Sequence, residues 1–338
     1  DLDTVDSVLT AEAGVILSEA RAAADTVGRV FPLSLASEGS ARIGGLLGTN
    51  AGGVNVLRYG NARDLCLGVE AVLADGSLLR GLSRLHKNNT GYDLRHLLIG
   101  SEGTLGIITA ASLRLYPALP ESGVAWIAVA SPAAALDLLA AFRDRLGGAI
   151  LAFELINAQG FAFLAETLPE VAPPALPASE WVVLAEVADG AGSRVADRFE
   201  AALVEALERG LASDALIAQN AHQREAFWTV RERIPEANRL IGSVSSHDIS
   251  LPLSRLAEFI ERAGAALHVL DPTLRINCFG HLGDGNLHYN VFPARGRPRS
   301  DYDAIRGAVK ETVHDLANAL GADQIDARFS ETEGNFDT

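Results

Sequence analysis

Two histidines beside a polar turn are the first candidates for chemistry in this sequence. His281 and His288 flank the segment Leu-Gly-Asp-Gly-Asn-Leu. An uninterrupted strand would place the two rings on opposite faces, because side chains alternate along a strand. The Gly-Asp-Gly-Asn interior favours a turn instead, and a turn can bring both rings to one side. Two converging imidazoles would supply two ligands of a common three-ligand metal site that usually takes a carboxylate as the third. Two buried structural histidines are the alternative.

Arg231 is the candidate for binding an anion. On a helix, Trp228 and Phe227 lie three and four residues before Arg231, so they could form an aromatic shelf beneath its guanidinium. A guanidinium held in this way suits bidentate capture of a carboxylate. The alternative is a solvated Arg-Glu-Arg face formed with Glu232 and Arg233.

Two glycine-rich segments could hold a phosphate-bearing cofactor. In residues 43–53, missing Cβ atoms would let a ligand approach the main chain, and Thr49 and Asn50 add hydrogen-bonding groups. This segment does not follow the GxGxxG strand-to-helix pattern, which disfavours a Rossmann site. Residues 100–109 place glycines before a β-branched strand, along whose edge a planar ring system could lie. Turns in a β-rich domain and a glycine-punctuated hairpin are the alternatives.

The elements that would position these residues suggest two domains of an α+β protein. The length of 338 residues fits two cores, and a linker is expected near residues 117–123. The first domain is expected to be β-rich, and the second to alternate strands and helices in an antiparallel or mixed sheet backed by helices. The expected first-domain elements are a strand in residues 4–15, a helix in 16–27, irregular backbone in 35–60, a hairpin around Asp75-Gly76 and a strand in 104–116. The expected second-domain elements are strands in residues 124–130, 181–187 and 215–219, and helices after Ser131-Pro132, in 193–209, around Phe227 and after Ser250.

Composition excludes several classes of function. Apolar residues make up 48% and charged residues 21%, as in ordinary globular proteins. The formal net charge of −15 opposes binding to nucleic acid or to anionic membranes, so an anionic substrate needs a local positive cluster. Residues 124–142 are interrupted by polar residues, and we expect no membrane span. Cys66 and Cys278 suggest no disulfide framework, which fits a reducing cytoplasm.

Taken together, the motifs resemble a known family. Residues 44–53, Tyr59-Gly60, residues 89–94 and residues 100–109 look like the FAD-contacting loops, in their usual order, of flavoproteins with the vanillyl-alcohol-oxidase type of FAD domain. The similarity is to the branch of D-lactate and D-2-hydroxyglutarate dehydrogenases and runs from about residue 4 to residue 321. It implies a partial FAD-binding domain over residues 1–118, a ferredoxin-like substrate cap over 119–325 and an irregular tail over 326–338.

The resemblance also implies roles for individual residues. Arg231 would bind the substrate carboxylate, Asn286 would lie beside the flavin or the substrate, and His281 and His288 would hold a divalent metal, zinc. The metal would polarise the hydroxyl of a small D-2-hydroxy acid (D-lactate, D-2-hydroxyglutarate or glycolate), a histidine would take its proton, and hydride would pass to FAD. The implied partners are this substrate and an acceptor such as a quinone or an electron-transfer flavoprotein, with a homodimer as one option for the assembly. The implied FAD contacts are Gly44, Gly45, Thr49, Asn50, Gly52, Gly53, Gly100, Glu102, Gly103 and Ile107.

The sequence departs from the family at both ends and inside the cap. The glycine-rich loop over the FAD pyrophosphate is expected before Asp1, and the chain has no Met, so the natural start is expected upstream. The Ser-Ala-Glu-His-Gly segment with the third metal ligand and the base is expected after Gly321, where the sequence continues without it. The acidic residues 323–338 show no helical or strand period. Ser246 stands where several relatives have Lys, and Pro235 where they often have Ser or Thr.

Two other functions remain open at this stage. One is a catalytically silent subunit that binds flavin or metal, which the missing base would explain. The other is a zinc-dependent hydrolase that uses His281 and His288 without flavin.

Overall fold

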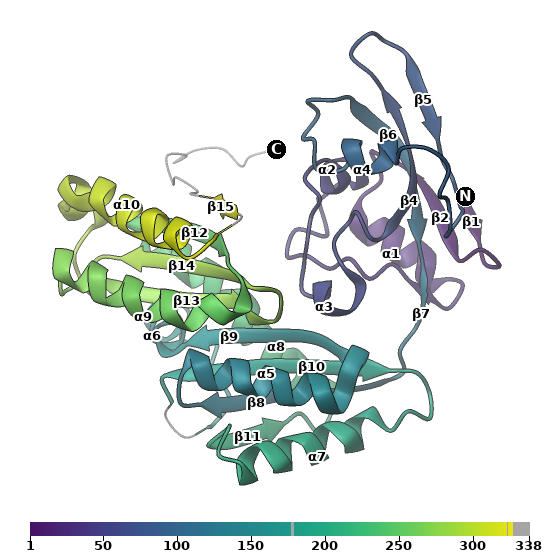
Figure 1. Ribbon diagram of the computed structural model, residues 1–338. Coiled ribbons are helices and arrows are strands. Elements are labelled where there is room, and N and C mark those ends of the chain that lie inside the picture. The colour runs from purple at the N-terminus through teal and green to yellow at the C-terminus, as the bar shows by residue number, and fades with distance from the viewer. Residues whose placement is uncertain (177–178, 323, 327–338) are drawn as a thin grey trace. The chain divides into compact units, whose positions relative to one another are not determined.

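The computed structural model describes residues 1–176, 179–322 and 324–326, and these form two compact units (Figure 1). Unit 1 is Asp1–Pro120 with Gly190–Gly192, and unit 2 is Glu121–Asp189 with the chain from Ser193 onward. Each unit combines antiparallel sheet with helices, so the α+β prediction is confirmed. No helix in the described ranges is both long enough and apolar enough to cross a bilayer.

Unit 1 is built on an antiparallel five-stranded sheet with the order β1-β2-β6-β4-β5. The expected hairpin is present, and Gly76 at its turn has a φ of +82°. The strands are β1 (Leu2–Asp3), β2 (Val8–Glu12), β4 (Cys66–Val72), β5 (Leu78–Gly81) and β6 (Ile107–Arg114), with β3 (Arg29–Val30) and β7 (Tyr116–Pro117) paired separately. The helices are α1 (Leu17–Asp25), α2 (Ile43–Gly48), α3 (Val56–Tyr59) and α4 (Leu94–Leu98).

Helix α2 corrects one expectation, because irregular backbone was expected throughout residues 35–60. Ile43, Leu46 and Leu47 follow the spacing of a buried helix face, and all three are buried. Gly44 lets this face lie close to the chain after β2, since a Cβ on Gly44 would be 2.6 Å from the Cβ of Ala13. Glycine's low helix propensity therefore predicts the wrong local structure here, and tertiary packing overrides it.

Unit 2 is built on an eight-stranded antiparallel sheet with the order β11-β8-β10-β9-β13-β14-β12-β15. Its strands are β8 (Glu121–Val129), β9 (Ile150–Asn157), β10 (Trp181–Asp189), β11 (Asp214–Ile217), β12 (Ser245–Ser250), β13 (Arg275–His281), β14 (Asn286–Phe292) and β15 (Gln324–Asp326). Its helices are α5 (Pro132–Leu146), α6 (Ala158–Thr167), α7 (Val195–Glu208), α8 (Ala221–Ile241), α9 (Leu253–Leu270) and α10 (Asp303–Ala319), with short 3-10 turns η1 (Gly147–Ala149), η2 (Leu282–Asp284) and η3 (Arg299–Tyr302).

This sheet contains two ferredoxin-like halves, where the sequence predicted one ferredoxin-like domain. The first half has the order of elements β8-α5-β9-β10-α7-β11, with α6 inserted between β9 and β10, and the second has β12-α9-β13-β14-α10-β15. Both follow the β-α-β-β-α-β pattern. The halves join edge to edge where β9 pairs with β13, and His281 is the register partner of Glu154 there. The sequence analysis predicted neither β9 nor α6.

Helices cover both faces of this sheet. Helices α5, α7, α9 and α10 lie on one face, and α6 and α8 pack together on the other (Figure 1). Between α6, α8 and the sheet lies an aromatic core that includes Trp126, Phe163, Phe227, Phe279 and Phe292. This core fixes α8, and therefore the side chains that α8 presents toward β12, β13 and β14.

The predicted helix start at Ser131-Pro132 is confirmed. Ser131 caps α5 by accepting a hydrogen bond of 3.1 Å from the backbone N–H of Ala134, and Pro132 follows at the first helical position. Asn220, which the sequence analysis did not identify as a cap, accepts from the backbone N–H of Gln223 at the start of α8. These caps begin helices that pack on opposite faces of the sheet.

The end of the chain differs in part from expectation. Residues 323–338 show no strand period, yet Gln324–Asp326 pair with β12 in antiparallel register as strand β15. The expected irregular tail therefore begins after Asp326 at the earliest, because backbone pairing to an existing edge does not require alternating side chains. Residues 327–338, to which most of that expectation refers, lie outside the described residues.

We predict that Gly44→Ala destabilises unit 1 by about 1 to 3 kcal/mol, because the added methyl overpacks the contact with Ala13. Gly48→Ala in the same helix is the control. A Cβ at Gly48 meets nothing within 4 Å, so this change should be neutral or stabilising through helix propensity. Urea denaturation of both variants measures the difference, and equal stabilities would show that α2 does not depend on the close contact.

Candidate functional site

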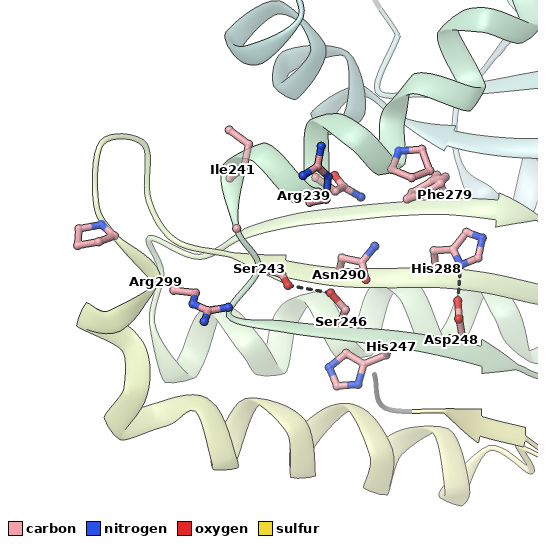
Figure 2. A pocket seen from close by; sticks show the side chains of 14 residues that line it. Arg239, Ile241, Ser243, Ser246, His247, Asp248, Phe279, His288, Asn290 and Arg299 are labelled. Carbon is pink, nitrogen blue, oxygen red and sulfur yellow. Dashed lines mark hydrogen bonds and ion pairs between the residues drawn. The ribbon is translucent and has the colours of Figure 1, made fainter. Parts of the chain in front are cut away.

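Unit 2 contains a pocket of about 720 Å³ between the C-terminal part of α8 and the neighbouring strands (Figure 2). Phe279 lines it from β13, and five residues line it from β12 and β14, four of which form two cross-strand pairs. Such a volume is typical of small-molecule sites. The polar residues that line it include Asn238, Arg239, Ser243, Ser246, Asp248, His288, Asn290 and Arg299.

The strands contribute two rows of polar residues to this pocket. Asp248 is the register partner of His288, and Ser246 is the register partner of Asn290. Residues two apart on a strand share a face, so the two rows follow one another along the same side of the sheet. His288 donates a hydrogen bond from Nδ1 to Asp248, and Figure 2 shows this contact.

Asn290 is a pocket residue that the sequence analysis did not identify. The residue is only 8% exposed, and its side chain makes no hydrogen bond within the described ranges. A buried amide without a protein partner normally binds water or a ligand. The available signal was its position two residues after His288, which places both side chains on one strand face.

The turn between β13 and β14 brings the two predicted histidines together. Phe279 is the register partner of His288, and His281 lies two residues further along β13, so both imidazoles share a face. Their ring centroids are 5.9 Å apart. Gly285, with a φ of +87°, completes the turn in a conformation that favours glycine.

The buried carboxylate of Glu154 links His281 to Arg231, and the sequence analysis missed it. Glu154 is 1% exposed on β9. Its Oε1 accepts from Nδ1 of His281 at 2.6 Å, and its Oε2 accepts from Nε of Arg231 at 2.8 Å. Nη2 of Arg231 lies 2.8 Å from the same Oε2 in an ion pair. The signal in the sequence was a single carboxylate inside the apolar stretch of β9, where a charge needs a partner.

The two cations determine the ionisation of Glu154. Burial raises its pKa, but the charges of His281 and Arg231, with their hydrogen bonds, outweigh burial and lower the pKa to about 2. The pKa of His281 changes in the reciprocal direction. Burial lowers it, while the charge and hydrogen bond of Glu154 outweigh burial and raise it. The three side chains therefore form one buried ionic cluster.

The surroundings of Arg231 correct the predicted aromatic shelf. Trp228 instead donates from Nε1 to Glu186 at 2.7 Å, and Phe227 belongs to the core between α8 and the sheet. The ring near the guanidinium is Phe279, whose centroid is 4.9 Å from the guanidinium carbon of Arg231. Arg231 is only 7% exposed, so the alternative of a solvated face is also wrong for this residue.

Asn286 lies at the start of β14 and on the same strand face as His288. Its Nδ2 donates to the hydroxyl of Ser250 at 3.0 Å, and its backbone N–H donates to Asp284 at 3.2 Å. The pocket lining does not include it. Its role beside the flavin or substrate stays a prediction.

The two glycine-rich segments of unit 1 adjoin one another. The backbone N–H of Gly100 donates to the carbonyl of Leu47, and that of Glu102 donates to the carbonyl of Gly48, both at 3.0 Å. Arg63 connects them further, because its backbone N–H binds Oδ1 of Asn50 at 3.0 Å and its Nη2 binds the Ile99 carbonyl at 2.6 Å.

The predicted cofactor contacts in these segments differ in whether packing or backbone conformation within the protein already accounts for the residue type. Gly44 and Gly53 have packing reasons to be glycine, since a Cβ on Gly53 would be 2.4 Å from the carbonyl oxygen of Ser34. A Cβ on Gly45 would meet nothing within 4 Å. Four further positions have positive φ, namely Asn50, Gly100, Glu102 and Gly103. Gly52 packs near Asn61 and Val56, Thr49 donates to the Gly45 carbonyl, and Ile107 is exposed on β6.

Two histidine nitrogens are available to a metal, but a full ligand set is not found. Nδ1 of each histidine contacts a carboxylate, so Nε2 is the atom that can bind a metal when the ring is neutral. His281, a cation in the ionic cluster, would have to lose its Nε2 proton to do so. Carboxylates commonly orient metal-binding histidines in this way. Among the described residues, no group of three His, Cys, Asp or Glu side chains could hold a metal ion.

Comparisons with known protein families cover most of the chain. Residues 120–322 match the family described as FAD linked oxidases, C-terminal domain, and residues 1–81 match the FAD binding domain family. The chain is 39% identical over 313 residues to D-2-hydroxyglutarate dehydrogenase, mitochondrial, of Arabidopsis thaliana, which is 93% of this chain and 55% of that protein. It is 36% identical to the putative mitochondrial D-lactate dehydrogenase of Schizosaccharomyces pombe, over 86% of this chain and 56% of that protein. The chain thus spans about half the length of these curated relatives.

Solved structures agree on the fold. Alkyldihydroxyacetonephosphate synthase matches with a TM-score of 0.71 and 15% identity, over 96% of this chain and 61% of that chain. A substrate-bound p-cresol methylhydroxylase matches with a TM-score of 0.64 and 17% identity, over 95% of this chain and 67% of that chain.

We predict that Glu154→Gln lowers the free energy of unfolding by about 3 to 5 kcal/mol, because it leaves Arg231 and His281 without their shared buried counterion. Glu236→Gln, which removes one of two carboxylates paired with Arg233 near the surface, should have little effect and serves as the control. Chemical denaturation compares the two. An equal small effect in both would mean that the buried cluster contributes little to stability.

The same variant predicts a change in the acid dependence of stability. Because the folded pKa of Glu154 is depressed from 4.5 to about 2, its contribution is present above about pH 4.5 and is lost as the pH falls toward 2. The Glu154→Gln variant should not show this part of the loss of stability, because it lacks the titrating carboxyl group. Unfolding free energies measured between pH 6 and pH 3 test it, and parallel curves for the two proteins would contradict the assignment.

Proposed function

Since the chain belongs to the FAD-linked oxidases, we propose that it oxidises a small D-2-hydroxy acid by transferring hydride to FAD. The observation that carries the proposal is the pocket of unit 2. In it, His288 and Asn290, whose amide has no hydrogen-bond partner among the described residues, lie on one strand face near the Arg231–Glu154–His281 cluster. We assign residues 1–118 to FAD binding and residues 119–325 to the substrate cap. A catalytically silent flavin-binding subunit is the competing function.

The residues of unit 1 are compatible with a bound dinucleotide. Gly45 faces open space, and the adjoining backbone at Asn50, Gly100, Glu102 and Gly103 has the positive φ that often presents main-chain N–H groups to an anion. The flavin, when bound, supplies the hydride acceptor. We propose these positions, with the other predicted contacts in the two segments, as the FAD site.

The residues of unit 2 would bind and orient the hydroxy acid. We propose that the N–H groups of Arg231 not used by Glu154 bind the substrate carboxylate, which charge-assisted hydrogen bonds would hold. Oxidation moves the C2 hydrogen as hydride and the hydroxyl hydrogen as a proton, leaving a 2-oxo acid. Nε2 of His288 is oriented by Asp248 to hold a proton or a metal.

We also propose that His281 and His288 hold a divalent metal, zinc, with a third ligand that the described residues do not provide. The metal would polarise the substrate hydroxyl. A quinone or an electron-transfer flavoprotein is the proposed acceptor. A cytoplasmic location and a homodimer stay predictions, and the plant and yeast relatives above are named as mitochondrial proteins.

Turnover tests the proposed function. The FAD-loaded protein should reduce a dye acceptor with D-2-hydroxyglutarate or D-lactate, and should not with the L-enantiomers. Arg231→Lys keeps the charge but loses the bidentate geometry, so kcat/KM should fall about ten- to hundredfold, equivalent to about 1.5 to 3 kcal/mol. Arg233→Lys on the same helix is the control. Retained flavin without any turnover would instead support the silent subunit.

Metal binding is tested separately from activity. Zinc titrated into the metal-free protein should bind one equivalent in a calorimeter, and His281→Gln or His288→Gln should weaken that binding at least tenfold. His222→Gln, an exposed histidine of α8, is the control. Unchanged zinc affinity in both site variants would remove the metal from the proposed site.

A further inference from the structure

One end of the pocket of unit 2 carries positive charge that has no role in the proposed oxidation. Arg239, near the C-terminus of α8, and Arg299, at the start of η3, both line it. In Figure 2 Arg299 lies beyond Ser243 and Ser246, on the side away from His288 and Asp248. Arg239 is exposed, and no acidic side chain pairs with it in the part of the chain that the structure describes.

The reacting end of the pocket is formed by Asp248 and His288. The spacing along the strands separates the arginine end from it by about one substrate length. The row of Ser246 and Asn290 follows the row of Asp248 and His288 by two residues on each strand. Two residues of strand span roughly 6.6 Å. Three C–C bonds of about 1.5 Å carry an extended acid roughly 4 Å from its C2 atom to a carboxyl carbon at C5. A second carboxylate would then lie over Ser246 and Asn290, within reach of long arginine side chains.

Local cations matter here because the whole chain repels anions. The net charge is −15, and Asp248 adds a carboxylate to the pocket itself. A doubly charged substrate meets more of this repulsion than a singly charged one, so it depends more on arginines near its path. Asn290 is nearly buried and its amide has no partner in the described part of the chain, so it adds a neutral hydrogen-bonding group at the same place.

We propose that Arg239 and Arg299 determine specificity by binding the distal carboxylate of a dicarboxylic 2-hydroxy acid. This inference rests on the proposed function for the reacting end, but concerns a separate part of the pocket. Both arginines lie at the ends of elements, and each can present several N–H groups to one carboxylate. A three-carbon acid such as lactate would not reach them and would leave them unused.

The decisive measurement is the ratio of kcat/KM for D-2-hydroxyglutarate to that for D-lactate. In Arg239→Gln and in Arg299→Gln of the FAD-loaded protein, this ratio should fall at least tenfold, with kcat/KM for D-lactate unchanged. Arg295→Gln, an exposed arginine four residues before Arg299 and outside the pocket lining, is the matched control. An unchanged ratio, or an equal fall for both acids, would overturn the proposal.

Binding of glutarate, a dicarboxylate that lacks the hydroxyl group, tests this proposal independently of the proposed oxidation. Calorimetry should detect glutarate binding to the unaltered protein and at least tenfold weaker binding to each variant, whether or not the protein turns over any hydroxy acid. Binding of this kind without turnover would support the anion subsite while contradicting the dehydrogenase. Undetectable glutarate binding, or equal binding to all forms, would refute the subsite.

Discussion

The buried ionic cluster of Glu154, Arg231 and His281 is the interaction on which the site in unit 2 depends. A carboxylate that is 1% exposed cannot stay charged in an apolar strand without partners, and here it has two. Each partner comes from a different element, α8 for Arg231 and β13 for His281. The electrostatic requirement of one side chain thereby fixes a helix and a strand relative to β9.

The cluster lies at the junction of the two ferredoxin-like halves. Strands β9 and β13 are the edges that meet, and Glu154 is the register partner of His281. Each half alone would leave one of these edges unpaired, and joining them satisfies the backbone groups of both strands. The join also places the β13–β14 turn next to a carboxylate from the other half. Both histidines belong to the second half, but the carboxylate that binds His281 comes from the first.

The pocket follows from how α8 crosses this sheet. The aromatic core anchors the middle of the helix through Phe227, while its last turns pass over β12 and β14 and leave polar strand residues accessible. Arg231 is drawn into the cluster, and Arg239, two turns later, lies at the pocket. One helix thus contributes one arginine to the framework and another to the cavity.

The sequence by itself determined the α+β class, the hairpin at Gly76, the caps at Ser131 and the turn that brings His281 and His288 to one face, because these follow from local rules of propensity and alternation. It could not determine the helix at residues 43–48, where packing on Ala13 overrides glycine's poor propensity. Only the tertiary structure decided that Glu154 is the partner of Arg231, since 77 residues separate them and nothing local links β9 to α8. Pairing of buried charges is a long-range requirement, and only the assembled sheet shows which groups meet.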